Sequence, residues 1–256
     1  MVVLYILGAL VAMFMAYVFL LGICALAASP RKTYNKDNGF YRFLLDSAIA
    51  VAMKLFRIHI HVTGFDKVPK DTRVLFVCNH RSGYDPLVTW YIFRRWNIAF
   101  ISKPENFKIP FFGRIALKCC CMAIDRENPR NAIATINRAA SLLKAQEVSI
   151  GVYPEGTRSK AGELLPFHNG VFKIAQKAEA SMVVLCLRGT ENIYRRIPFR
   201  ATDVYLDVLE VFSSADIKAN KTEIIGTQVR GLMENNLGKE INGVSVSEQE
   251  GSLSRQ

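Results

Sequence analysis

The sequence lacks the cysteine spacings that mark a disulfide framework or a zinc site. It has six cysteines in 256 residues, and no two of them form a CxxC pair. Patterned cysteines are the usual signature of both structures, so we expect buried thiols in a reducing compartment and no bound metal. The sequence also lacks internal repeats and low-complexity linkers, and its length suits one core with an appendage. The cysteines are Cys24, Cys78, Cys119, Cys120, Cys121 and Cys186.

Charged residues are absent from the first 30 positions. As a helix, the apolar residues 2–28 would extend roughly 40 Å, more than the hydrocarbon core of a bilayer, about 30 Å. Arg31 and Lys32 follow at once, and basic residues at such an edge favour the cytoplasmic side. A cleaved signal peptide is the alternative, because Ala25-Leu26-Ala27 resembles a cleavage site, but no basic segment precedes the run and the run is too long. We expect a retained anchor that spans or re-enters the membrane.

Acidic residues are outnumbered in this chain. It has 33 Lys and Arg against 22 Asp and Glu, a net charge of +11 and a pI of about 9.5. That balance suits an anionic partner such as nucleic acid, acidic lipid or a phosphorylated substrate. Mean hydropathy is +0.15, which is high for a purely soluble protein. Residues 40–56 place apolar side chains at helical spacing, which predicts an amphipathic helix in the membrane interface or, equally, a core helix of the domain.

Short apolar strands alternate with helical segments beyond Arg57. This alternation predicts an α/β domain over residues 57–240, with a mixed, mostly parallel sheet flanked by helices. A membrane-binding helical segment would precede it over residues 1–56, and a polar tail would follow over residues 241–256. His59 and His61 would share one strand face, which is more typical of a solvent face than of a metal site. The predicted strands cover residues 57–63, 73–78, 97–102, 119–124, 148–153, 182–188 and 204–211; the clearest helices cover residues 131–146, 171–178 and 222–240.

The stretch NHRSGYDPL, residues 79–87, places a histidine and an aspartate five residues apart directly after a predicted strand. Asp85 precedes a proline, as a helix-capping aspartate does, and His80 could be an ordinary loop histidine. The same pair could equally form a catalytic base with its orienting acid. From this stretch alone, both interpretations stay open.

Three other predicted strands end in basic residues. These are Lys103 in ISKPE, Arg126 in AIDREN and Arg158 in YPEGTRS. Ligands of α/β sheets bind beyond the carboxyl ends of the strands, so the three cations would meet on one side of the sheet. Such a site would hold a phosphate group, and Gly156 would let the backbone approach the anion closely.

These motifs together resemble those of the glycerolipid acyltransferases. NHRSGYD is similar to their NHxxxxD motif, AIDREN to their second motif and YPEGTRS to their third, while KIPFFG and PFHNGVFKIAQKA also fit. The resemblance covers roughly residues 62–190 in the right order. HxxxxD alone is a weak signal, but the ordered set is specific. Within the family the sequence looks most similar to the lysophosphatidic acid acyltransferases.

The resemblance implies a fold, a reaction and a set of roles. The family fold is an α/β domain with an N-terminal membrane-binding helical part. His80 would be the general base and Asp85 would orient it, so that the acceptor hydroxyl attacks a thioester carbonyl without a metal or other cofactor. The acyl donor would be acyl-CoA or acyl carrier protein, the acceptor lysophosphatidic acid and the product phosphatidic acid, made by a domain on the cytoplasmic side of a membrane. The implied substrate-binding residues are Lys103, Arg126, Glu155, Gly156, Thr157 and Arg158.

The proposed base is physically reasonable, since imidazole exchanges protons near neutral pH. Ser82 offers an acyl-serine alternative and His168 an alternative base. The sequence departs from the family pattern at Val184, where proline is usual, and at His168, where a basic residue is common. These departures put the acyl pocket and the acceptor in question. The remaining alternatives are another lysolipid acceptor and a non-enzymatic protein that binds membranes or nucleic acid through its basic charge. The last would want extra aromatic platforms or a long basic tail, and the tail here is neither long nor basic.

Overall fold

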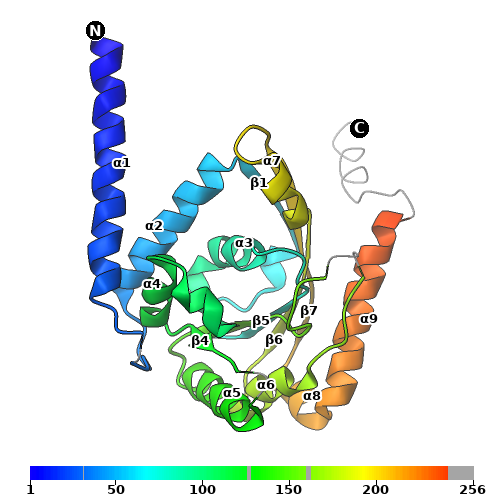
Figure 1. Ribbon diagram of the computed structural model, residues 1–256. Coiled ribbons are helices and arrows are strands. Elements are labelled where there is room, and N and C mark those ends of the chain that lie inside the picture. Colours follow the sequence, from blue (N-terminus) through cyan, green and yellow to red (C-terminus); the bar gives the residue numbers. More distant parts are fainter. Residues whose placement is uncertain (31, 126–127, 160–162, 242–256) are drawn as a thin grey trace.

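The computed structural model describes residues 1–30, 32–125, 128–159 and 163–241. Within these residues, a seven-stranded sheet forms the centre of the domain, in the order β1-β7-β6-β2-β5-β3-β4 (Figure 1). The strands are β1 (Ile58–Thr63), β2 (Leu75–Cys78), β3 (Ile98–Ser102), β4 (Met122–Ala123), β5 (Ser149–Val152), β6 (Met182–Arg188) and β7 (Thr202–Phe212).

The sheet is mixed and mostly parallel, as the sequence predicts. Neighbouring strands are parallel throughout except for β6 and β7, which are antiparallel. The three central strands β2, β5 and β6 are buried along their whole length. A strand covered by helices on both faces has to be apolar on both sides, which explains why these segments are almost continuous hydrophobic runs.

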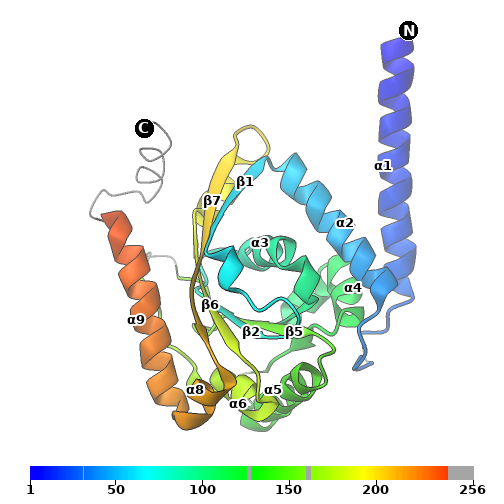
Figure 2. The same cartoon turned by 180° about the vertical axis from the view of Figure 1, so that it is seen from behind.

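Helices cover both faces of the sheet (Figure 1, Figure 2). One group consists of α2, α3 and α4, in which α2 contacts both of the others. A second group joins α5, α6 and α8, with α9 against β6 and β7. The helices of the domain are α2 (Gly39–Leu55), α3 (Asp85–Ile92), α4 (Phe112–Lys118), α5 (Pro129–Lys144), α6 (Lys173–Ala178), α7 (Ile193–Arg196), α8 (Ser214–Ala219) and α9 (Thr222–Ile241). Short 3-10 helices are η1 (Phe65–Lys67), η2 (Arg94–Trp96), η3 (Pro104–Lys108), η4 (Asn169–Phe172) and η5 (Thr190–Asn192).

The first helix, α1 (Val2–Leu26), stands away from the domain over most of its length (Figure 1, Figure 2). Its later turns touch the domain, where the Tyr17 hydroxyl lies 2.6 Å from Ser47 Oγ and the Tyr41 hydroxyl donates to Cys24 O. Among the described residues it is the helix that is long and apolar enough to cross a membrane. An exposed apolar helix of this length indicates that the protein associates with a membrane.

Helix α2 is apolar on two sides. One side is buried against the domain through Leu44, Leu45 and Ile49, so the helix is part of the core. The other side exposes Phe40 and Phe43. The core-helix alternative is therefore right for one side, and the exposed apolar side still fits a membrane interface.

The structure around the three consecutive cysteines differs from the prediction. The predicted strand over residues 119–124 is only Met122–Ala123, because Cys119 ends α4 and Cys120 has a positive φ of 62°. Helix α4 itself was not predicted. It begins in KIPFFG, where a Cβ on Gly113 would lie 2.4 Å from Phe107 O, so only glycine fits there.

Candidate active site

The site begins where β2 ends, at a side chain that extends the sheet. The Asn79 amide donates from Nδ2 to Leu187 O at 2.9 Å and accepts at Oδ1 from Leu187 N at 2.7 Å. The buried Asn79 side chain therefore makes the two hydrogen bonds to Leu187 of β6 that the backbone of a neighbouring strand would otherwise make. This reciprocal pair fixes the point at which the chain leaves β2, immediately before His80.

His80 is oriented by Asp85. Its Nδ1 lies 2.7 Å from Asp85 Oδ2, and the same oxygen accepts from the backbone N–H groups of Arg81 and Ser82 at 2.7 and 2.8 Å. The other oxygen, Oδ1, accepts from the Thr190 hydroxyl at 2.5 Å. A carboxylate oxygen accepts, so Nδ1 is the donor and carries the hydrogen. That tautomer leaves the lone pair on Nε2.

Two further residues, Tyr153 and Glu155, contact His80 and hold it in place. The Tyr153 ring stacks on its imidazole, with ring centroids 4.5 Å apart, and burial raises the pKa of the Tyr153 phenol well above its usual value. Glu155 Oε1 accepts from His80 N at 2.7 Å, while Oε2 accepts from Leu165 N at 2.9 Å. Burial raises the pKa of the Glu155 carboxyl, and the two backbone hydrogen bonds oppose that shift. Both oxygens of Glu155 are thus engaged by the backbone.

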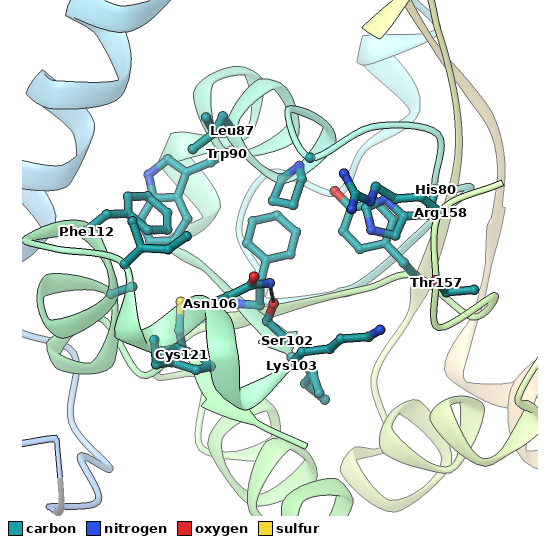
Figure 3. Close-up of a pocket in the computed structure, with 18 of the residues that line it drawn as sticks. His80, Leu87, Trp90, Ser102, Lys103, Asn106, Phe112, Cys121, Thr157 and Arg158 are labelled. Atoms are coloured by element: carbon teal, nitrogen blue, oxygen red, sulfur yellow. Dashed lines mark hydrogen bonds between the residues drawn. The ribbon is translucent and has the colours of Figure 1, made fainter. Parts of the chain in front are cut away.

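A cavity of about 450 Å³ opens beside His80 (Figure 3). Figure 3 shows Arg158 directly beside His80, and Lys103 in another part of the lining, near Ser102. Apolar side chains, among them Leu87 and Trp90, line the part farther from the imidazole. The cavity is therefore amphipathic, with a cationic part next to the imidazole and an apolar part beyond it. Its lining includes Lys103, Asn106, Phe112, Cys121, Gly156, Thr157 and Arg158.

A second, more apolar cavity of about 750 Å³ adjoins the first. It lies between α1 and the segment that joins η3 to α4, and it shares Phe107 and Ile109 with the cavity at His80. Phe111 forms part of its wall and packs over Gly22 of α1. The apolar side of the site thus faces the membrane helix.

Comparison with known proteins identifies the family of the chain. A protein-family model described as Acyltransferase matches residues 59–188. The chain belongs to the acyltransferase family. The matched region includes the whole of the His80 loop, η3 and the turn that carries Arg158.

Several relatives of this acyltransferase carry a more specific name. A Cocos nucifera protein named 1-acyl-sn-glycerol-3-phosphate acyltransferase is 34% identical over 130 residues, which are 51% of this chain and 42% of that protein. The match thus spans less than half of that relative. A Borreliella burgdorferi protein of the same name is 29% identical over 197 residues, 75% of this chain and 78% of the other. The crystal structure of a Thermotoga maritima 1-acyl-sn-glycerophosphate acyltransferase shares the fold, with a TM-score of 0.65 at 23% identity and 80% of each chain covered.

Most residues singled out from the sequence meet at this site of the acyltransferase. His80, Lys103 and Arg158 line the cavity, together with Gly156 and Thr157, while Asp85 is buried behind His80. Gly156 has a positive φ of 71°, which an L-residue rarely adopts. Glu155 is not among the lining residues and holds the backbone of His80 instead. The residue Arg126 lies outside the described residues.

The sequence does not show how three residues hold the pair, although two of them, Asn79 and Tyr153, stand within the NHRSGYD and YPEGTRS motifs. Thr190 and Asn79 act across strands that are far apart in the chain, at separations of 105 and 108 residues from their partners. Tyr153 is the first residue of the YPEGTRS motif, so its place near the site could be expected from that motif. His168, the alternative base, is exposed and does not line the cavity.

Proposed function

We propose that this acyltransferase moves a fatty acyl group from an acyl thioester to the sn-2 hydroxyl of lysophosphatidic acid and so makes phosphatidic acid. The observation that carries the proposal is the His80–Asp85 pair at an amphipathic cavity, with Arg158 beside the imidazole and Lys103 elsewhere in the lining. An anionic lipid with one long chain has the matching distribution of charge and apolar surface. The names of the relatives support the same acceptor.

His80 acts in this proposal as a general base. Its Nε2 takes the proton of the acceptor hydroxyl while the hydroxyl oxygen attacks the thioester carbonyl carbon, forming the new C–O bond. The tetrahedral intermediate then collapses with cleavage of the C–S bond, and the departing thiolate receives the proton from His80. Asp85 keeps the ring in place through both steps and stabilises the imidazolium between them.

The phosphate of the acceptor binds at the cationic part of the cavity. Lys103 Nζ and the Arg158 guanidinium are the charged groups we assign to it, with the Thr157 hydroxyl as a further donor. Arg158 reaches across the His80 loop, since its Nη1 lies 3.8 Å from the position of a Cβ on Gly83. The turn at Gly156 brings the backbone close to the anion, and Glu155 contributes by fixing the loop. Arg126 remains a candidate for the same phosphate.

The donor is acyl-CoA or acyl carrier protein, reached from the cytoplasmic side of the membrane. Residues 1–56 serve as anchor and interfacial helix, residues 57–240 as the acyltransferase domain, and residues 241–256 as a polar tail. The exposed apolar length of α1 and the outer side of α2 support this division. A lysolipid stays in the bilayer, so an anchored domain meets its acceptor there without extracting it into water.

Another lysolipid is the second candidate acceptor, because Val184 replaces the proline usual in the family. Val184 is fully buried within β6, beside a register shift between β6 and β7, and it does not line the cavity. The departure thus lies in the sheet rather than in the wall of the site, which favours lysophosphatidic acid.

A transfer assay tests both the reaction and the acceptor. Purified protein in mixed micelles receives radiolabelled oleoyl-CoA and a panel of lysolipids, and products are separated by chromatography. We expect phosphatidic acid from the wild type and a loss of about 10²- to 10⁴-fold in His80→Ala. His168→Ala is the matched control, since His168 is an exposed histidine outside the cavity, and it should keep wild-type turnover.

Each other outcome has a defined meaning. Product from a different lysolipid alone would keep the mechanism and replace the acceptor. Loss of turnover in His168→Ala and not in His80→Ala would remove His80 as the base. Absence of product with every acceptor, and with carrier-protein donors as well, would contradict the proposed function.

A further inference from the structure

A second surface of this protein combines exposed aromatic side chains with arginines. Residues 194–200, with the sequence YRRIPFR, comprise the last three residues of α7 and most of the loop to β7, and are called here the arginine–aromatic segment. Tyr194 is 80% exposed and Phe199 is 85% exposed. Outside residues 1–26, they are the two most exposed large apolar side chains in the part of the chain that the structure describes.

The segment is held in this conformation by its own backbone and by the domain. Ile193 is fully buried, and Ile197 packs partly against the core. Backbone bonds run from Ile197 N to Ile193 O and from Arg200 N to Arg196 O. Arg57 Nη1 also donates to Phe199 O at 3.2 Å. Two isoleucines therefore face inward while the aromatic rings face outward, so the exposure of the rings belongs to the folded segment.

The charge of the segment has one sign. Arg195, Arg196 and Arg200 are all exposed, and no Asp or Glu occurs between positions 192 and 202. Arg57, also exposed, adds a fourth cation next to Phe199. Exposed aromatic rings flanked by arginines are typical of surfaces that rest in the headgroup region of a bilayer, where rings enter the apolar boundary and guanidinium groups meet phosphates.

The position of the segment agrees with a membrane on that side. In Figure 1 and Figure 2, α7 and the adjoining loop lie at the end of the domain towards which the free N-terminal part of α1 points, and α5 lies at the opposite end. The last turn of α2 also ends there, with Leu55 exposed. A bilayer that takes up the free part of α1 would therefore lie over this end of the domain.

We propose that the arginine–aromatic segment is a second membrane-contact surface, which binds the headgroup region of an anionic bilayer beside the α1 anchor. Tyr194 and Phe199 enter the interface, and Arg195, Arg196 and Arg200 bind lipid phosphates. Two separated contacts fix the tilt of the domain, which a single helix leaves free to rotate about its axis. The proposal concerns orientation on the membrane and does not depend on which lysolipid is the acceptor.

A single fluorescent label tests the contact in the full chain. The native cysteines are all buried, so an exposed cysteine introduced by Phe199→Cys is labelled selectively with acrylodan. The protein is reconstituted into vesicles of phosphatidylcholine, with or without phosphatidylglycerol and with or without brominated lipid. Ile133→Cys on α5 is the matched control, because Ile133 is 60% exposed and lies at the opposite end of the domain.

We expect the label at position 199 to shift to shorter wavelength and to be quenched by brominated lipid, more strongly when phosphatidylglycerol is present, while the label at position 133 does neither. Replacing Arg195, Arg196 and Arg200 by glutamine should weaken the dependence on phosphatidylglycerol, since each basic residue near an anionic surface strengthens binding about fivefold. Identical behaviour of the two labels would overturn the proposal. A shift at position 199 that follows protein concentration and not lipid would also overturn it and would assign the surface to a protein contact. Circular dichroism checks that each variant is folded, and neither readout requires turnover.

Discussion

Thr190 holds the second oxygen of the Asp85 carboxylate, and replacing it with valine removes that one contact. Thr190 and Asp85 are both fully buried, so no water replaces the lost hydroxyl. A hydrogen bond to a charged group contributes about 1.5–3 kcal/mol. If this energy is lost from the transition state, kcat falls roughly ten- to hundredfold. The KM for the lysolipid should stay nearly constant, because Thr190 does not line the cavity.

The assay compares Thr190→Val with Thr190→Ser, which keeps the hydroxyl and should stay within a few-fold of wild type. The same valine substitution is then made in His80→Ala. Since Thr190 acts only through the Asp85–His80 pair, it should change the residual rate of that variant very little. Wild-type kcat in Thr190→Val would refute the reasoning. An equal fall in both backgrounds would also refute it, because the effect would then come from a general loss of structure.

Three further outcomes follow from buried groups. Arg42→Met leaves Asp37 buried and unpaired, so thermal unfolding in detergent should show a free energy of unfolding lower by about 3–5 kcal/mol. Lys144→Met, which breaks an exposed ion pair, should change the melting temperature little. Burial raises the pKa of Glu155 above its usual 4.5, so the folded state binds more protons there than the unfolded state. The contribution of Glu155 to the free energy of unfolding should therefore fall as pH rises from 4.5 through the folded pKa. Glu155→Gln should remove this slope when the free energy of unfolding is measured against pH. Burial raises the pKa of Cys121 to about 11, so mass spectrometry should find it unalkylated by iodoacetamide in the folded protein at neutral pH and alkylated after unfolding.

The sheet could be predicted because its buried strands are distinctive in sequence. β2, β5 and β6 are apolar runs of four to seven residues that end at turn residues, and α5 places its apolar residues at helical spacing on one face. The short helices α4, α7 and α8 have only four to seven residues, which is too few to show a period. The cysteine run imitated a strand because apolar residues of a short buried helix and of a buried strand look alike.

The site could be predicted where its residues are close in sequence or stand at the ends of predicted strands, as Lys103 and Arg158 do. His80 and Asp85 are close enough in the chain for their spacing to suggest a pair. The bond from Thr190 to Asp85 depends on how β2 and β6 lie side by side, which spacing does not encode. The family resemblance predicts a substrate-binding role for Glu155, which stays a prediction; its two oxygens accept from the backbone N–H groups of His80 and Leu165.

The structure contradicts the capping interpretation of Asp85, because α3 begins at Asp85 itself, while its orienting role stays a prediction. Asp85 does not cap α3 with its side chain; its carboxylate points back to bond Arg81 N and Ser82 N, and so it holds the turn. The same oxygen receives His80 Nδ1, so the turn and the orientation of the imidazole share one group. A change at Asp85 therefore alters the loop and the base together. A change at Thr190 affects only Asp85 Oδ1, the oxygen that bonds neither the turn nor the imidazole. For this reason the Thr190 series separates orientation of the base from folding of the loop more cleanly than any substitution of Asp85 itself.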